Sequence, residues 1–352
     1  MELSKAQQKI VEAKENKIVV IASAAAGKTA VLTERTRYLL EHGADPTKMV
    51  LITFTNAAAE ELAERLDHPK GMFIGTIHSY ANYLLLSYGK ETADLLESEQ
   101  FDRLFERIKK HPNCIKEVDH LMLDESQDSN ESHFEFLLDM VKPKNYMLVG
   151  DHKQSIYRWN GAFPQYLIDL AQDPTVTTYD LNENYRNGYK ILDFARGIIN
   201  AAGYEYKDSS RPMRGVAGKV IDVEYSPVAI ARAIKGMGDY RNWFVLARTN
   251  DQLDEIAFFL KKEGIPIDTF KRSELDNKEL GKKMKEDTVK VLTIHTAKGL
   301  EANNVVVIGA KFFNVEERCV SYVAATRAKN LLVWTKMPNR SRKVQQMTSW
   351  ER

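Results

Sequence analysis

The sequence predicts an α/β protein in which two parallel-sheet domains follow one another along the chain. Three observations support this: short apolar runs alternate with amphipathic stretches, the alternation occurs twice, and the first apolar run enters a loop of small residues before a helical stretch. Parallel strands need a crossover, usually a helix, so regular alternation favours parallel sheets covered on both faces. The expected domains are residues 1–182 and 183–352, with the junction near Asp180–Arg186.

The individual elements follow from β-branched or apolar runs and from amphipathic stretches. In the first domain the expected strands are Ile18–Ala22, Met49–Phe54, Met72–Thr76, His120–Leu123, Tyr146–Val149 and Val176–Tyr179, and the expected helices are Lys28–Glu41, Ala57–Leu66, Phe101–Lys110 and Ser132–Met140. In the second domain the expected strands are Val220–Val223, Trp243–Ala247, Val289–His295, Val305–Ile308 and Leu331–Trp334, and the expected helices lie near Asp251–Lys262 and Glu316–Lys329. Gly203–Gly218 is expected to be a loop, and Arg272–Glu286 an exposed, charged connection.

Composition and charge exclude several classes of protein. The 352 residues are 43% hydrophobic and 28% charged, which is typical of globular proteins, and no apolar run has the length of a membrane span or a secretory signal. Cys114 and Cys319 are the two cysteines, so a disulfide framework is excluded and a reducing, cytoplasmic setting is expected. Lys and Arg total 50 against 49 for Asp and Glu, so any site for a polyanion must be a local groove.

The segment 22–29, ASAAAGKT, has the context of a phosphate-binding loop. Small residues let backbone N–H groups approach phosphates, Lys28 would contact the β- and γ-phosphates, and the Thr29 hydroxyl would bind Mg²⁺. The residues expected to hold ATP here are Ala24, Ala25, Ala26, Gly27, Lys28, Thr29 and Ala30. Two departures matter: Ala22 stands where the usual pattern has Gly, and Gly27 is the only glycine inside the loop. If Ala25 must adopt a positive φ, the strain would cost about 1 kcal/mol. A plain strand–helix turn with a surface lysine is the alternative.

An apolar strand ends in two carboxylates in the sequence HLMLDESQD. Asp124 would bind Mg²⁺, and Glu125 would orient or deprotonate the attacking water. The alternative is a helix start with acidic residues in its first turn, where they favour the helix dipole.

A third polar cluster follows the strand that ends LVGD. Gln154 comes three residues after the Asp and is suited to sense the γ-phosphate. Tyr157 and Trp159 lie in a polar context and are suited to stack on bases. The alternative is that both rings close a domain surface.

Together these segments resemble superfamily 1A helicases, typified by UvrD, Rep and PcrA. The resemblance covers nearly the whole chain, and the matching segments in order are LSKAQQ, ASAAAGKT, ITFTNAAAEELAERL, GTIHSY, DESQD, GDHKQSIYRWNGA, LNENYRN, TIHTAKGLEANNVVVIG and YVAATRAKN. It implies two RecA-like motor domains with the ATP site in the cleft between them.

The resemblance also implies roles for residues outside the phosphate loop. At the nucleotide, Gln7 would recognise adenine and Tyr185 would stack on it, while Arg35 and Glu301 would make further contacts. The residues expected to act in catalysis are Lys28, Glu125, Gln154, Arg186 at the γ-phosphate, and Arg327 as the second arginine finger. DNA would be contacted by Phe54, Thr55, Asn56, Thr76, His78, Tyr157, Trp159, Thr293 and His295. A metal-binding role for either histidine is disfavoured, because no ligand partner occurs at useful spacing.

The function expected from the resemblance is an ATP-dependent single-stranded DNA translocase and DNA helicase with 3′→5′ polarity. ATP and Mg²⁺ are the expected cofactors, and single-stranded DNA and tailed or forked duplexes the expected partners, with replication or repair proteins beside them. The protein is expected to be a monomer without membrane contact, in the cytoplasm of a bacterium or a phage-infected cell. About forty residues separate His78 from the DESQD motif, and about forty separate the strand at Trp243–Arg248 from TIHTAKG, so large accessory subdomains are not expected. The sequence ends soon after YVAATRAKN, so a nuclease domain is not expected either.

Two other functions remain open from the sequence. One is an accessory DNA-binding protein that uses nucleotide without hydrolysing it, for which the loop alanines are the support. The other is an RNA-directed motor, because contacts to a nucleic-acid backbone do not reveal the sugar.

Overall fold

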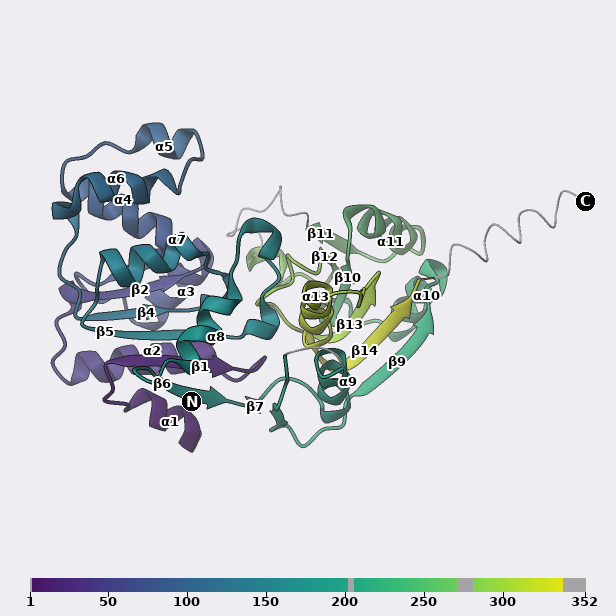
Figure 1. Cartoon of the computed structure of the whole chain (residues 1–352). Coiled ribbons are helices and arrows are strands. Elements are labelled where there is room, and N and C mark those ends of the chain that lie inside the picture. The colour runs from purple at the N-terminus through teal and green to yellow at the C-terminus, as the bar shows by residue number, and fades with distance from the viewer. Residues whose placement is uncertain (1, 202–205, 271–280, 338–352) are drawn as a thin grey trace, which may run out of the picture. The chain divides into compact units, whose positions relative to one another are not determined.

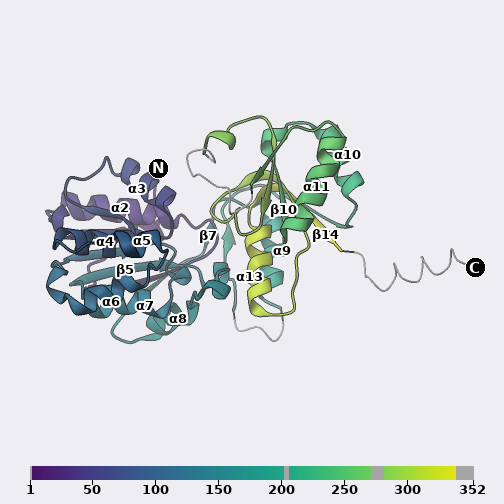
Figure 2. The ribbon, with the colours of Figure 1, turned by 90° about the horizontal axis from the view of Figure 1, so that it is seen from above.

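The computed structural model describes residues 2–201, 206–270 and 281–337 and shows an α/β fold with parallel sheets, as predicted (Figures 1 and 2). The chain divides into two compact units, unit 1 (residues 1–182) and unit 2 (residues 183–352). Each unit carries its own six-stranded sheet.

The sheet of unit 1 has the strand order β3-β2-β4-β5-β1-β6, and all its neighbouring strands run parallel. Its strands are β1 (Lys17–Ala22), β2 (Met49–Thr53), β3 (Phe73–Thr76), β4 (His120–Leu123), β5 (Asn145–Gly150) and β6 (Thr177–Leu181). Because β1 lies between β5 and β6 rather than beside β2, the chain crosses the sheet after β1. Ligands of open α/β sheets bind outside the carboxyl ends of strands at such a point.

Helices cover both faces of this sheet (Figure 1). They are α1 (Lys5–Val11), α2 (Lys28–Glu41), α3 (Asn56–Arg65), α4 (Ile77–Ser87), α5 (Ala93–Glu97), α6 (Arg103–Lys110), α7 (Glu131–Phe134), which continues as a π-helix over Glu135–Met140, and α8 (Pro164–Gln172). One face packs against α4, α6, α7 and α8, and the other against α1, α2 and α3. In β1, Val19 faces the first group while Ile18 and Val20 face the second, because successive side chains alternate across a strand.

The sheet of unit 2 has the order β11-β12-β10-β13-β14-β9 and is also parallel. Its strands are β9 (Lys219–Glu224), β10 (Trp243–Ala247), β11 (Ile267–Phe270), β12 (Val289–Thr293), β13 (Ala302–Ile308) and β14 (Ala328–Lys336). A separate parallel pair joins β7 (Glu183–Asn184) to β8 (Arg211–Pro212).

Four helices of the described part of unit 2 pack on its sheet, α9 (Tyr189–Ile199), α10 (Pro227–Met237), α11 (Asn250–Lys262) and α13 (Val315–Ala325). The helices α10 and α11 share one apolar core with β10, β12 and β13. The helices α9 and α13 pack against each other and against β14.

The helix predicted over Glu316–Lys329 is wrong at its end. The helix stops at Ala325, and Ala328 already pairs with Ala302 in the sheet, so residues with good helix propensity are taken into β14. Strands β7 and β11 and helices α1, α5, α8, α9 and α10 were not predicted. In the predicted loop 203–218, Arg211–Pro212 forms β8. Residues 202–205 of that loop and 271–280 of the predicted connection lie outside the described residues.

The two cysteines are buried thiols, Cys114 in unit 1 and Cys319 in unit 2. Among the helices of the described residues, none has the length and apolar character needed to cross a lipid bilayer.

Gly188, just before α9, generates a test of unit 2. A Cβ on Gly188 would lie 2.6 Å from the backbone nitrogen of Gly218, so Gly188→Ala must displace main chain. We expect this substitution to lower the free energy of unfolding by about 1–3 kcal/mol, measured by urea denaturation.

Gly197 is the control, because it lies within α9, the helix that Gly188 precedes, and a Cβ there meets nothing within 4 Å. Gly197→Ala should raise stability by up to about 1 kcal/mol through helix propensity. Equal effects at the two glycines would contradict the close approach at Gly188.

Candidate functional site

Three loops of unit 1 meet at one edge of its sheet. The strands β4, β5 and β1 are neighbours and run parallel, so the segments after Leu123, Gly150 and Ala22 leave the sheet side by side. These segments contain the predicted Asp124 and Glu125, the predicted Gln154, and the predicted phosphate loop. The fold therefore brings together residues that are more than a hundred positions apart.

Lys28 lies at the start of α2 and faces the carboxylates of this edge. Its Nζ is 3.2 Å from Oε1 of Glu125, and its side chain is 11% exposed. Burial alone lowers the pKa of Lys28, but the charges of Glu125, Asp151 and Asp124 outweigh it, so the pKa is raised. Lys28 is thus a charged ammonium paired with Glu125 in the field of two further carboxylates, rather than a surface lysine on a plain turn.

Asp124 is a deeply buried carboxylate of the group, at 5% exposure. Burial, followed by repulsion from Glu125, raises its pKa above the ordinary aspartate range, while Lys28 opposes that rise. Its carboxylate accepts the Glu125 backbone N–H at 2.8 Å and a hydrogen bond from the Thr29 hydroxyl. A carboxylate and a hydroxyl in contact are oxygen donors of the kind that Mg²⁺ prefers.

A chain of hydrogen bonds links Glu125 to Gln154. The Gln127 amide nitrogen donates to the Glu125 carboxylate, and Gln127 Oε1 accepts the backbone N–H of Asp151 at 2.9 Å. Asp151 in turn accepts from Gln154 Nε2 at 2.7 Å and pairs with Lys153 at 2.9 Å. Sequence reasoning missed Gln127, because a glutamine in a polar turn carries no signal of a bridge until the two strands are adjacent.

The backbone is strained on both sides of Lys28. Ala25 has φ 57° and Glu125 has φ 50°, both in the left-handed region that side chains with a Cβ avoid. Gly27 has φ 83° and precedes α2, where a Cβ would come within 2.7 Å of Gln7 Nε2. The conditional expectation of a positive φ at Ala25 is confirmed, and strain of this kind concentrates at functional sites.

The predicted residues Gln7 and Arg35 have different surroundings. Gln7 is buried, accepts the Ser4 N–H and donates Nε2 to the Ala26 carbonyl at 3.0 Å, so it braces the loop. Arg35 is about two helical turns beyond Lys28 and donates to the Val11 carbonyl at 2.7 Å. It lines a small cavity together with residues that begin β1, β4 and β5, at the edge opposite the loop. The fold does not bring Arg35 to the phosphate loop.

The aromatic residues predicted to contact DNA form a row on unit 1. Phe54 and Tyr157 are stacked with ring centroids 5.2 Å apart and an interplanar angle of 17°. Tyr157 meets Trp159 edge-on at 6.4 Å. Trp159 is 60% exposed and Phe54 37%, so the outer end of the row is open to solvent.

Thr55 and Thr76 begin helices rather than projecting as free hydroxyls. Thr55 Oγ1 accepts the Ala58 N–H and caps α3, while Thr76 Oγ1 accepts the Ser79 N–H and caps α4. Asn56 is exposed in the first turn of α3. Both helices start at the carboxyl edge of the sheet, where backbone N–H groups favour anions such as phosphate.

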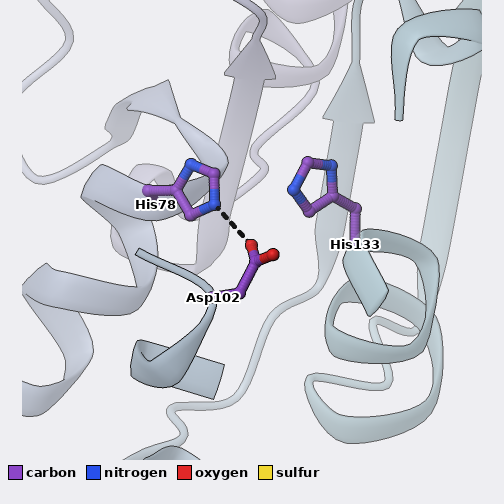
Figure 3. A group of neighbouring side chains, drawn as sticks. All are labelled: His78, Asp102 and His133. Atoms are coloured by element: carbon purple, nitrogen blue, oxygen red, sulfur yellow. Dashed lines mark hydrogen bonds and ion pairs between the residues drawn. The ribbon is translucent and has the colours of Figure 1, made fainter. Parts of the chain in front are cut away.

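His78 lies in the first turn of α4, beside two residues that the sequence did not connect with it. Its Nε2 is 3.2 Å from Oδ1 of Asp102, and the ring of His133 lies next to both (Figure 3). Their ligand atoms all lie within 4.8 Å of one another. The prediction that His78 lacks metal-ligand partners is therefore wrong, because the partners are 24 and 55 positions away in sequence.

In unit 2, Arg186 is paired with Glu301. Its Nε donates to the Glu301 carboxylate, which also pairs with Lys329. Burial raises the pKa of Glu301, but the two cations outweigh this and lower it. Tyr185 is 42% exposed and donates its hydroxyl to Glu183.

The other predicted residues of unit 2 are less open. Arg327 is 2% exposed and donates to the carbonyls of Val323 and Leu300 at 3.0 and 3.2 Å. Thr293 ends β12 and shares a hydrogen bond with Thr296, and His295 follows two residues later.

The strain at Ala25 gives a test of the loop. Ala25→Gly should remove the cost of the left-handed backbone, about 1–2 kcal/mol, from the folded state. It should also stabilise the unfolded state by about 0.4–1 kcal/mol, because glycine gives the unfolded chain more conformational entropy. We therefore expect a net gain of about 0.5–1 kcal/mol in the free energy of unfolding, measured by urea denaturation. Ala24→Gly is the matched control and should destabilise, because Ala24 is buried and does not have a positive φ. Shifts of the same sign in both variants would contradict the strain.

Comparison with known proteins assigns most of the chain to one family. The model of the UvrD/REP helicase N-terminal domain matches residues 3–114 and 100–175, and that of the UvrD-like helicase C-terminal domain matches residues 268–339. ATP-dependent DNA helicase Rep of Escherichia coli is 25% identical over 368 residues, 76% of this chain. A probable DNA helicase of Mycoplasma pneumoniae is 25% identical over 432 residues, 89% of this chain and 79% of its own length.

The chain spans 55% of the length of the Escherichia coli protein. Among solved structures, the PRRSV helicase is 15% identical, with a TM-score of 0.49, covering 97% of this chain and 55% of its own; that likeness is too distant to add to the assignment. The two family models together match more than half of the residues, in the order that the sequence motifs predict. The chain belongs to the UvrD/Rep/PcrA family of helicases.

Proposed function

We propose that this protein is an ATP-dependent motor that moves 3′→5′ along single-stranded DNA and unwinds duplex DNA. The observation that carries the proposal is the partly buried Lys28–Glu125 ion pair at the carboxyl edge of the sheet, with left-handed backbone at Glu125 itself and at Ala25. Family membership supports the same reading, since its relatives include proteins named ATP-dependent DNA helicase.

The residues of unit 1 fit an ATP·Mg²⁺ complex. Lys28, charged and preceded by Gly27 with its backbone in the left-handed region, would bind the β- and γ-phosphates. Asp124 and the Thr29 hydroxyl would hold Mg²⁺, which neutralises charge on the phosphates when bound. The phosphates would then replace Glu125 as the partner of Lys28, and Glu125 would be free to take a proton from the attacking water.

Gln154 and the arginines would complete catalysis. Gln154 is linked to Glu125 through Asp151 and Gln127, so a change at the γ-phosphate can reach the base through hydrogen bonds. Arg186 and Arg327 would stabilise charge on the γ-phosphoryl group. For this, Arg186 must exchange Glu301 for phosphate, and Arg327 must release backbone carbonyls. Tyr185, Gln7 and Glu301 remain the proposed contacts to the rest of the nucleotide.

The aromatic row of Phe54, Tyr157 and Trp159 would stack on successive bases. The helix starts at Thr55–Asn56 and Thr76–His78 would contact the phosphodiester backbone, and Thr293 and His295 would add contacts from unit 2. The proposed substrates are tailed or forked duplexes, and the proposed partners are replication or repair proteins. The protein would act as a monomer in the cytoplasm of a bacterium, a setting that the bacterial source of the relatives supports.

Lys28→Ala tests the ATP site. We expect it to lower the DNA-stimulated ATPase rate by at least about 100-fold, because the phosphate charge would lose its main partner and Glu125 would lose its ion pair. The ATPase rate is measured without polymer, with single-stranded DNA and with single-stranded RNA. Lys48→Ala is the matched control, an exposed lysine paired with Glu117 that should leave the rate unchanged.

The same assay separates the alternatives. Stimulation by DNA above RNA supports a DNA motor, stimulation by RNA alone would replace it with an RNA motor, and no turnover at all would indicate a non-hydrolysing binder. With tailed duplexes, preference for a 5′ tail would overturn the proposed polarity.

Trp159→Ala tests the stacking row. The loss of one stacked base should weaken single-stranded DNA binding by about 1–3 kcal/mol, or roughly 5- to 150-fold in Kd, measured by fluorescence anisotropy at fixed salt. Phe258→Ala is the matched control, because Phe258 is 61% exposed but lies on α11 against Phe259. Unchanged affinity in the Trp159 variant would remove the row from the DNA site.

A further inference from the structure

The side chains of His78, Asp102 and His133 converge from three separate elements of unit 1 (Figure 3). His78 is in the first turn of α4, Asp102 directly precedes α6, and His133 is in α7. All three helices pack on the same face of the sheet. Among the residues that the structure describes, this is the one group of at least three His, Cys, Asp or Glu ligand atoms gathered closely enough for a metal ion.

The spacing of the group suits a small metal ion. Four ligands bound at about 2.0–2.1 Å in a tetrahedron lie about 3.3 Å apart. His78 Nε2 and Asp102 Oδ1 are already 3.2 Å apart, and no pair in the group exceeds 4.8 Å. Asp102 is exposed and its carboxylate makes no capping bond to α6, so it can move toward an ion at little cost.

His133 supplies an independent observation. It is 9% exposed, its Nε2 has no hydrogen-bond partner among the described residues, and Figure 3 shows that one ring nitrogen turns toward His78 and Asp102. The other nitrogen, Nδ1, accepts the Asn130 backbone N–H at 3.4 Å, a long bond that would be given up on metal binding at Nε2, because the ring proton would then lie on Nδ1. A buried ring nitrogen without a hydrogen-bond partner, aimed at two other ligand atoms, is what an empty metal site would leave behind.

The two imidazole rings are held in place by Phe105. Its ring stacks on His78 at 5.4 Å and meets His133 edge-on at 5.8 Å. The ligand orientations are therefore set by packing before any ion arrives. A site that is arranged in advance binds its metal without first ordering its side chains.

We propose that His78, Asp102 and His133 bind a divalent transition-metal ion such as Zn²⁺, with a fourth position open to water or another ligand. Two imidazoles and one carboxylate favour Zn²⁺ or a similar ion over Mg²⁺ or Ca²⁺, which prefer oxygen ligands. The ion would fasten the start of α6 to α4 and α7. The site is separate from the proposed Mg²⁺ position at Asp124 and does not depend on the proposed motor function.

A cavity connects the proposed metal site with the carboxylates of the candidate nucleotide site. It has a volume of about 60 Å³ and is lined by His78 and His133 together with Phe54, Thr76, Asp124 and Glu125. The open position of the ion would therefore lie in a cavity shared with the carboxylates of the candidate nucleotide site and with predicted DNA contacts.

The experiment measures metal binding by the full chain. Protein freed of metal with a chelator is titrated with Zn²⁺ against a chromophoric indicator, and with Co²⁺, whose visible absorption reports coordination. Asp102→Asn and His133→Ala are compared with wild type. Matched controls are Asp94→Asn, an exposed aspartate on the neighbouring α5, and His111→Ala, at the end of α6. His78 is left intact because it is a proposed DNA contact.

We expect one equivalent of Zn²⁺ per chain, with affinity reduced at least tenfold by Asp102→Asn and further by His133→Ala, and unchanged in both controls. Zn²⁺ should raise the melting temperature of wild type and of the controls but not of Asp102→Asn, which is at an exposed position and should fold normally. Absence of stoichiometric binding, or equal binding by wild type and Asp102→Asn, would overturn the proposal and leave an ordinary His–Asp pair stacked on Phe105.

Discussion

The Lys28 ammonium is attracted by carboxylates that follow two other strands, and this attraction constrains the order and direction of the strands in unit 1. Glu125 and Asp124 follow β4, and Asp151 follows β5, so the charges meet only if β1, β4 and β5 are adjacent and parallel. A largely buried cation without partners is costly, and so is a buried carboxylate such as Asp124 without a cation nearby. Lys28 and the carboxylates meet in the presence of three features: the strand order, the left-handed backbone at Glu125, and the start of α2 at Gly27, which has no side chain to cap the helix.

The fold class could be predicted because its signal is local. Apolar runs such as Trp243–Ala247 and the helix Lys28–Glu41 carry their own periodicity and boundaries. The end of α13 could not be predicted, because pairing between Ala328 and Ala302 overrides the helix propensity of the segment. The short strand β11 has only four residues, too few to show a period.

In the candidate site, too, residues with a local sequence signal could be predicted and contacts made only on folding could not. Lys28, Asp124 and Glu125 could be proposed from short motifs, since each follows a recognisable strand. The bridge through Gln127 and the group of His78 with its two partners depend on neighbours that the chain brings together only on folding. Arg35 shows the converse: its position in the chain suggested the nucleotide, and the fold directs its guanidinium to the carbonyl of Val11, which ends α1.

The phosphate loop is also tied to the point where the chain leaves unit 1. Ser23 donates its backbone N–H to the Leu181 carbonyl at 2.8 Å, and its hydroxyl is 3.3 Å from Asn182 Oδ1. Asn182 is the last residue of unit 1, and Glu183 begins β7. The segment by which the chain leaves unit 1 is therefore hydrogen-bonded to Ser23, the residue before Ala24. A change in the conformation of this loop would act directly on the first residues of the connection to unit 2.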